Sequence, residues 1–125
     1  MLTKGIINLA IAEAEKSTYK FKMGAVIFKG KRILGSGHNG IRSSASIKNK
    51  FKNYINSLHA EQAALMNINW CKVKGASIFI VKVSHRYGMI SMASPCKMCR
   101  EILSHVGINN IYYSDSNGQI VHEEI

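Results

Sequence analysis

The sequence predicts one α/β domain, spanning residues 1–125, in which helices cover the faces of a single mixed sheet. Three observations indicate this fold class. A chain of 125 residues has the length of one domain. Apolar positions with helical spacing alternate along the chain with short, mostly apolar runs that are typical of strands. The resulting order, α-β-β-α-β-α-β-β, implies a mixed five-stranded sheet.

The first half of the chain is expected to begin with a helix and a hairpin. Residues 2–16 carry apolar side chains at a helical period. Residues 23–28 and 32–36 are short apolar segments around a Lys-Gly-Lys turn, which predicts a β-hairpin. Residues 42–56 have no clear period, so we expect a polar, basic loop there.

Two later helices are predicted from their capping residues. The second helix should start near Ser57, because serine is a good N-cap residue. Ser94 should cap the third helix, with Pro95 at its first helical position. Gly107 should end that helix, since glycine tolerates the left-handed conformation just past a helix end.

Three strands are expected in the second half. The mostly apolar run at 77–83 is typical of a strand buried on both faces, and residues 85–93 should form a loop after it. Residues 109–114 read as another strand. The turn sequence at 115–118, Asp-Ser-Asn-Gly, precedes the last strand, so the last two strands should be antiparallel.

Composition and charge limit the classes of function. With 46% hydrophobic and 19% charged residues and one proline, the chain is neither disordered nor collagen-like. No apolar run approaches the roughly 20 residues that span a bilayer. Glu13 and Glu15 also stand where a signal peptide would be cleaved, so we expect a cytoplasmic protein with no membrane partner.

Basic residues are concentrated in the first half. The 17 basic and 7 acidic side chains give a net charge of +10, and no acidic residue occurs between Lys16 and Ala60. Such a field attracts ligands that carry phosphate. A solvated surface that keeps the protein soluble is the alternative interpretation.

Two helix starts hold the residues that indicate chemistry. His59 stands in His-Ala-Glu, and Cys96 and Cys99 stand in Pro-Cys-Lys-Met-Cys. An imidazole and two thiolates are three zinc ligands, and three protein ligands leave one tetrahedral position open for water, as in catalytic sites. Cysteines three apart near a helix N-terminus share one face, and the helix dipole favours their thiolates. The third cysteine, Cys71, has no expected role.

Glu61 is the candidate catalytic residue. It lies two residues after His59, and on a regular helix it would point away from His59 around the axis. At a helix N-terminus, both side chains can still reach a metal placed ahead of that end. A carboxylate beside zinc-bound water can take the proton of that water and later deliver it to the substrate or leaving group.

These motifs resemble the zinc-dependent cytidine deaminase superfamily, whose signature is H-x-E followed by P-C-x-x-C. The resemblance covers nearly the whole chain. Residues 19–26 (Y-K-F-K-M-G-A-V) look like the segment that leads into the first strand of free-nucleoside cytidine deaminases. Residues 94–101 look like their S-P-C-x-x-C-R-Q stretch, with Glu101 in place of glutamine. Residues 37–40 (G-H-N-G) are closer to deoxycytidylate and tRNA adenosine deaminases.

The resemblance implies a three-layer α/β/α cytidine-deaminase-like fold that assembles as a homo-oligomer. It also implies one zinc ion per chain, held by His59, Cys96 and Cys99, with Glu61 as the proton shuttle. Arg100, next to Cys99, would either neutralise the thiolates or be an ordinary surface residue.

The substrate contacts expected from the resemblance are Asn39, Ala25, Ala60, Phe21 and Arg42. Asn39 matches an asparagine that contacts sugar or base, and Ala25 matches a position that lines the base pocket. Phe21 either flanks the base or belongs to the core. Nucleoside deaminases carry an acidic residue shortly after the asparagine. That residue is missing here, and Arg42 would suit a phosphate better.

The expected reaction is hydrolytic deamination of a cytosine nucleotide, with deoxycytidylate preferred and the nucleoside second. Base deamination within RNA or single-stranded DNA would also suit the basic half, although 125 residues leave little room for an extended groove. A zinc-stabilised binding module without turnover would not need Glu61. A C-x-x-C redox protein would leave His59 unexplained.

Overall fold

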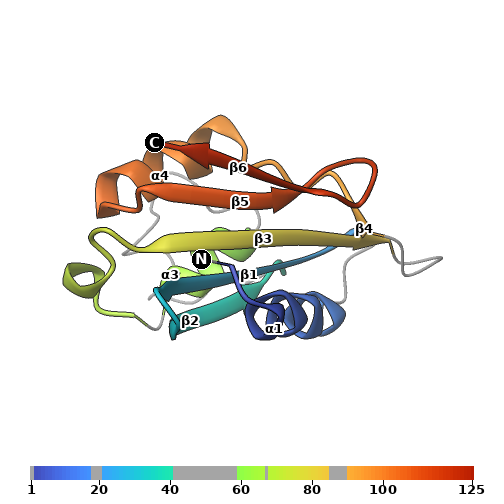
Figure 1. Cartoon of the computed structure of the whole chain (residues 1–125), viewed down its shortest axis with the longest axis horizontal. Coiled ribbons are helices and arrows are strands. Elements are labelled where there is room, and N and C mark those ends of the chain that lie inside the picture. The colour runs from blue at the N-terminus through green and yellow to red at the C-terminus, as the bar shows by residue number, and fades with distance from the viewer. Residues whose placement is uncertain (1, 18–20, 41–58, 67, 85–89) are drawn as a thin grey trace.

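The computed structural model describes residues 2–17, 21–40, 59–66, 68–84 and 90–125, and it shows three layers (Figure 1). A mixed sheet forms the middle layer. Helix α1 (Lys4–Glu15) packs on one face, and helices α3 (Ala60–Met66) and α4 (Lys97–Val106) pack on the other. The predicted α/β/α fold class is therefore confirmed.

The sheet is built from six strands: β1 (Phe21–Lys29), β2 (Arg32–His38), β3 (Ser77–Ser84), β4 (Ile90–Ser91), β5 (Asn110–Ser114) and β6 (Ile120–Glu124). Five of them follow the order β2-β1-β3-β5-β6, and β4 pairs with β3. Strands β3 and β5 are parallel and are joined through α4, whereas the other pairs are antiparallel. The predicted antiparallel pairing of the last two strands is confirmed.

Strand β4 corrects the prediction of five strands. It lies in the segment 85–93, which was expected to be a loop, and residues 85–89 of that segment are outside the described part. The buried hydroxyl of Ser114, at the end of β5, explains the pairing. It donates a hydrogen bond to the Ser91 carbonyl at 2.6 Å. Its own oxygen, Ser114 Oγ, lies 3.4 Å from the Lys82 amide on β3. A two-residue strand held by a distant serine leaves no periodic signal in the sequence.

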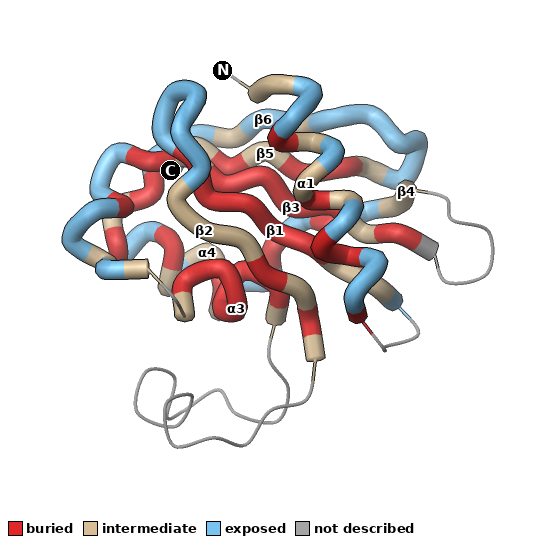
Figure 2. Tube along the Cα trace, turned by 90° about the horizontal axis from the view of Figure 1, so that it is seen from below, coloured by how far each residue is buried: buried red, intermediate tan, exposed pale blue. Residues whose placement is uncertain are grey.

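The predicted hairpin is formed by β1 and β2. Gly30 in its turn has φ 62°, a left-handed conformation that glycine adopts without strain. Strand β1 then pairs with β3 along eight residues, from Phe21 opposite Ser84 to Phe28 opposite Ser77. These two strands form the buried centre of the sheet (Figure 2).

Helix α1 lies directly against β1. The Thr3 hydroxyl accepts a hydrogen bond from the Ile6 amide and caps the helix. Ala10 and Ala14 are fully buried, and a Cβ added at Gly24 of β1 would meet the Ala10 carbonyl and, at 2.6 Å, the Ala14 amide nitrogen. This close approach requires glycine at position 24.

One acidic side chain, Glu13, is buried on α1. Its carboxylate lies 2.7 Å from Lys16 Nζ and 3.4 Å from His38 Nδ1. Burial by itself raises the pKa of Glu13, but the hydrogen bonds and positive charges of Lys16 and His38 outweigh burial and leave the pKa below its usual value of 4.5. The carboxylate therefore links the helix to the end of β2.

Helix α3 lies equally close to β2 on the opposite face. A Cβ added at Gly37 would lie 2.5 Å from the Ala64 amide nitrogen and 2.6 Å from the Ala63 carbonyl carbon. Gly35, earlier on β2, approaches Ile68 after the end of α3, whereas Gly37 approaches Ala63, so the N-terminus of the helix lies toward the carboxyl end of the strand. This contact fixes the position of the start of α3, and with it the positions of His59 and Glu61.

The helix starts differ from the predicted ones. Helix α4 begins at Lys97 with Cys96 as its N-cap, two residues later than the start predicted from Ser94 and Pro95, because Cys96 is still extended at φ −70° and ψ 167°. Gly107 ends α4 at φ 94°, as predicted. Helix α3 begins at Ala60, and the predicted cap Ser57 lies outside the described residues.

The predicted basic loop at 42–56 also lies outside the described residues. None of the helices in the described part of the chain is long and apolar enough to cross a membrane.

Candidate metal centre

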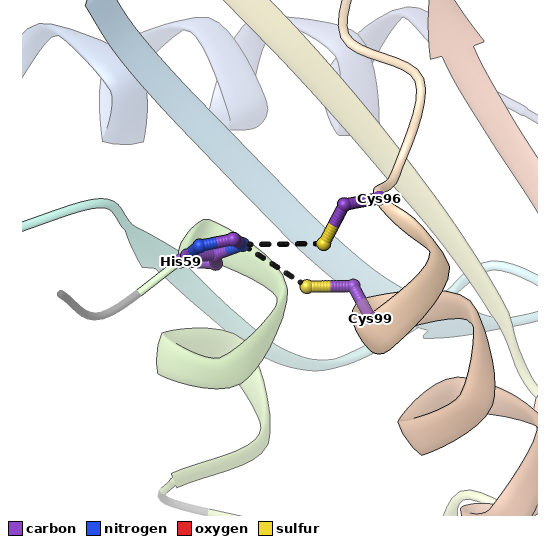
Figure 3. Close-up of side chains that lie close together, drawn as sticks. All are labelled: His59, Cys96 and Cys99. Carbon is purple, nitrogen blue, oxygen red and sulfur yellow. Dashed lines mark hydrogen bonds between the residues drawn. The ribbon is translucent and has the colours of Figure 1, made fainter. Parts of the chain in front are cut away.

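Three side chains that can bind a metal ion meet between α3 and α4. The Nδ1 atom of His59 lies 3.2 Å from Cys99 Sγ and 3.7 Å from Cys96 Sγ, and the three donor atoms all lie within 4.8 Å of one another (Figure 3). The structure thus brings together the two motifs that lie 37 residues apart in the sequence.

The hydrogen bonds at the start of α3 fix the backbone of His59. Its amide donates to Gln62 Oε1 at 2.9 Å, and its carbonyl accepts from the Ala63 amide at 2.9 Å. The first of these is the half of a capping box in which the side chain at the third helical position reaches back to the N-cap amide. His59 therefore serves as the N-cap and presents its ring ahead of the helix.

The two cysteines have different surroundings. Cys96 is exposed and precedes α4, whereas Cys99 is buried in the first turn of that helix. Their spacing of three residues places both thiols on the side of α4 that faces α3. The site is therefore closed on the Cys99 side and open to solvent on the Cys96 side.

The donor set fits a zinc ion. Zinc binds histidine nitrogen at about 2.1 Å and thiolate sulfur at about 2.3 Å, so tetrahedral angles place nitrogen and sulfur roughly 3.6 Å apart. The observed separations of 3.2 Å and 3.7 Å bracket that value. With Nδ1 facing the thiols, the proton of a neutral His59 ring belongs on Nε2.

Glu61 is buried beside this cluster. Glu61 is 3% exposed, and its buried Oε1 atom has no hydrogen-bond partner among the residues that the structure describes. Burial raises the pKa of Glu61, while a hydrogen bond with the backbone, the electrostatic influence of nearby His59 and a hydrogen bond with Cys99 partly oppose that rise. An unpartnered buried carboxylate oxygen costs free energy and is typical of a group that meets a ligand.

The acidic groups of the site favour a bound cation. Burial raises the pKa of the Cys99 thiol well above its usual range, and the negative charges of Glu61 and Cys96 raise it further. A divalent cation offsets these charges and removes the thiol proton. The fit of the site to zinc therefore rests on its charges as well as on its distances.

The residues expected to contact the substrate differ in burial and in hydrogen bonding. Ala25 and Ala60 are fully buried in the core between the sheet and the two helices. The Asn39 side chain is bound to the β1 backbone: Oδ1 accepts from the Met23 amide at 3.0 Å, and Nδ2 donates to the Phe21 carbonyl at 2.8 Å. Phe21 is 54% exposed and therefore does not belong to the core. Arg42 lies outside the described residues.

Two further residues, one in the metal centre and one on the same face of the sheet, were not predicted. Gln62 is 1% exposed, and its Nε2 atom has no hydrogen-bond partner in the described part of the chain, although Oε1 accepts from the His59 amide. Lys82 lies on the sheet face that α3 and α4 cover, with Nζ 4.4 Å from the centre of the Phe21 ring. Gln62 could have been found as the third helical residue of a capping box, whereas Lys82 carries no signal in the sequence.

Comparisons with known proteins assign the family. A family model for the cytidine and deoxycytidylate deaminase zinc-binding region matches residues 3–115. The chain belongs to this family. No curated protein sequence matches the chain.

Solved structures share the fold of this family member. The dCMP deaminase of cyanophage S-TIM5 in its apo form is 25% identical, with a TM-score of 0.57 over 92% of this chain and 86% of that chain. The same phage enzyme in complex with dCMP and dUMP is 24% identical, with a TM-score of 0.58 over 93% and 85%. RibD of Acinetobacter baumannii, form 2, is 21% identical and has a TM-score of 0.54, and the match covers 87% of this chain but 27% of that longer chain.

Family membership and geometry agree on the metal. The family is named for its zinc-binding region, and His59, Cys96 and Cys99 are the group in the described part of this chain that is positioned to hold such an ion.

Proposed function

We propose that this deaminase hydrolyses a cytosine nucleotide to its uracil form and ammonia, with zinc as cofactor. The buried Glu61 carboxylate carries the proposal, because Oε1 has no hydrogen-bond partner among the described residues and the carboxylate lies beside Cys99, in a site whose one nitrogen and two sulfurs could hold a metal. A zinc ion that only stabilises the fold would usually have four protein ligands and would not need this carboxylate.

Each residue has a distinct part in the reaction. His59, Cys96 and Cys99 would hold the ion, which supplies an activated water at neutral pH when bound. Glu61 accepts a proton from water and delivers it to the ring nitrogen as the hydroxide adds to C4 of the cytosine. It then takes the proton of the new C4 hydroxyl and passes it to the amino group, which leaves as ammonia when the C4–N bond breaks, so water and cytosine yield uracil and ammonia. The raised pKa of Glu61 suits a group that both takes and gives a proton.

A nucleotide is the preferred substrate class. The net charge of +10 favours ligands that carry phosphate, and Lys82 adds a positive charge on the sheet face that the site helices cover. The relative that was solved with dCMP and dUMP supports the same class. Arg42 remains our candidate for the phosphate contact, and the exposed ring of Phe21 is suited to stacking against the base.

Glu61→Gln tests the proposed role of the carboxylate. The variant keeps the shape of the side chain but cannot move a proton, so turnover should fall by about 10²–10⁴-fold while zinc content and thermal stability stay near wild type. Glu101→Gln, which changes an exposed glutamate on α4, is the matched control and should keep full activity. Near-native turnover of Glu61→Gln would show that the mechanism is wrong.

A further inference from the structure

Arg100 joins three parts of the chain around Cys96. Its Nε atom donates to the Pro95 carbonyl at 3.2 Å, and Nη2 donates to Ser94 Oγ at 2.8 Å. The same Nη2 lies 2.8 Å from Glu123 Oε2 on β6. One guanidinium thus connects α4, the segment that enters the metal centre and the last strand.

The position of Cys96 depends on the segment that precedes α4, because the helix itself fixes Cys96 only in part. It is the N-cap of α4, its backbone is extended, and its side chain makes no capping hydrogen bond. Its carbonyl accepts from the Arg100 amide at 3.0 Å. Pro95, the residue before it, has no N–H with which to anchor the backbone.

Arg100 therefore holds three successive residues. Its amide fixes the Cys96 carbonyl, and its side chain fixes Pro95 and Ser94. The planar guanidinium donates in several fixed directions at once, whereas a lysine ammonium is a point charge on a flexible stem. The geometry thus depends on arginine rather than on positive charge alone.

Glu123 orients this guanidinium. Its Oε2 atom is shielded from solvent, and the ion pair with Arg100 at 2.8 Å offsets its charge. Glu123 pairs in register with Ile111, a core residue of β5, and so lies on the sheet face that α4 covers. An isolated surface ion pair contributes little to stability, but this one fixes a donor that has two further acceptors.

From these contacts we infer that Arg100, held by Glu123, is a positioning residue that sets Cys96 for metal binding. The inference rests on the proposed metal site and deepens it. Arg100 acts through the Ser94 hydroxyl and the Pro95 carbonyl, not by touching substrate. Partners behind metal ligands typically change metal affinity 10–100-fold when they are mutated.

Metal binding by Arg100→Ala, Arg100→Lys and Glu123→Gln tests the inference. Zn²⁺ affinity is measured by competition with a chromophoric chelator, the Co²⁺ absorption spectrum reports the coordination geometry, and Tm is measured on the metal-free chains. Arg32→Ala is the matched control, because Arg32 is exposed at the start of β2. We expect both Arg100 variants to bind Zn²⁺ about 10–100-fold more weakly and to alter the Co²⁺ spectrum, with a smaller loss for Glu123→Gln and none for Arg32→Ala.

Two results would overturn the inference. One is wild-type Zn²⁺ affinity and Co²⁺ spectrum in both Arg100 variants. The other is a loss of affinity accompanied by an equal loss of stability in the metal-free chain, which would indicate a purely structural role. If Arg100→Ala does not fold, Ser94→Ala and Glu123→Gln, which each remove a single contact, decide by the same criteria.

Different results would contradict the proposed function. A wild-type chain that binds no Zn²⁺ contradicts the metal site itself. A wild-type chain that binds Zn²⁺ but releases no ammonia contradicts the activity and leaves the Arg100 comparison intact.

Discussion

Gly37→Ala should damage stability and the metal centre together. The added Cβ would lie 2.5 Å from the Ala64 amide nitrogen, whereas ordinary contacts are 3.4–4 Å, so α3 has to move by roughly 1 Å. Overpacking of this kind costs about 1–3 kcal/mol, which for 125 residues lowers Tm by roughly 4–12 °C. Because α3 carries His59 and Glu61, a displacement of about 1 Å should also lower activity by about 100-fold.

Two glycine variants serve as controls for this experiment. Gly24→Ala makes the same chemical change on the opposite face, against the backbone of α1, and should lower Tm without weakening Zn²⁺ binding by the folded chain. At Gly40 an added Cβ would meet no atom of the described residues within 4 Å, so Gly40→Ala should change neither Tm nor Zn²⁺ binding. Differential scanning fluorimetry, chelator competition and ammonia release give the three readouts. Wild-type activity in Gly37→Ala, or an equal loss of Zn²⁺ affinity in Gly24→Ala, would refute the argument that β2 positions α3.

Three further predictions concern the metal, acid stability and phosphate. Cys99→Ala should lose the zinc found in the wild type by metal analysis, whereas Cys71→Ala, at an exposed cysteine, should keep it. The folded-state pKa of Glu13 is lowered, so its contribution to stability is present above about pH 4.5 and disappears as the pH falls through the folded-state pKa. The urea midpoint should therefore fall less steeply with decreasing pH in Glu13→Gln than in the wild type. The same pH dependence in both chains would contradict the role of Lys16 as the partner of Glu13. Arg42→Ala should lower kcat/KM strongly for deoxycytidylate and hardly at all for the nucleoside, while equal losses on both would remove Arg42 as the phosphate contact.

The order of helices and strands could be predicted because each main element leaves a periodic or turn signal. The hairpin around Gly30 and the end of α4 at Gly107 are confirmed, since both glycines adopt left-handed conformations that few other residues tolerate. The start of α4 was predicted two residues early. Serine followed by proline is a strong capping signal, but the Arg100 side chain binds Ser94 and Pro95 and Cys96 is still extended, and that tertiary contact is not visible in local sequence.

The meeting of His59 with the two cysteines could be predicted from motif spacing, and the structure places them together. The hydrogen bonding of the Asn39 side chain could not be predicted from the sequence. Its amide binds the backbone of β1, and this contact depends on where β2 ends relative to Phe21 and Met23. Lys82 was missed for the same reason, because only the pairing of β3 with β1 brings it over the Phe21 ring.

Product analysis of the zinc-loaded chain tests the central claim most directly. The chain is incubated with deoxycytidylate, deoxycytidine and a cytosine-containing single-stranded oligonucleotide, and ammonia and the uracil product are measured against a chelator-stripped sample. We predict one ammonia for each uracil formed, fastest on deoxycytidylate, with activity lost on stripping and restored by Zn²⁺. Fastest turnover of the oligonucleotide would assign the activity to nucleic acid instead, and intact cytosine in all three substrates would contradict the account.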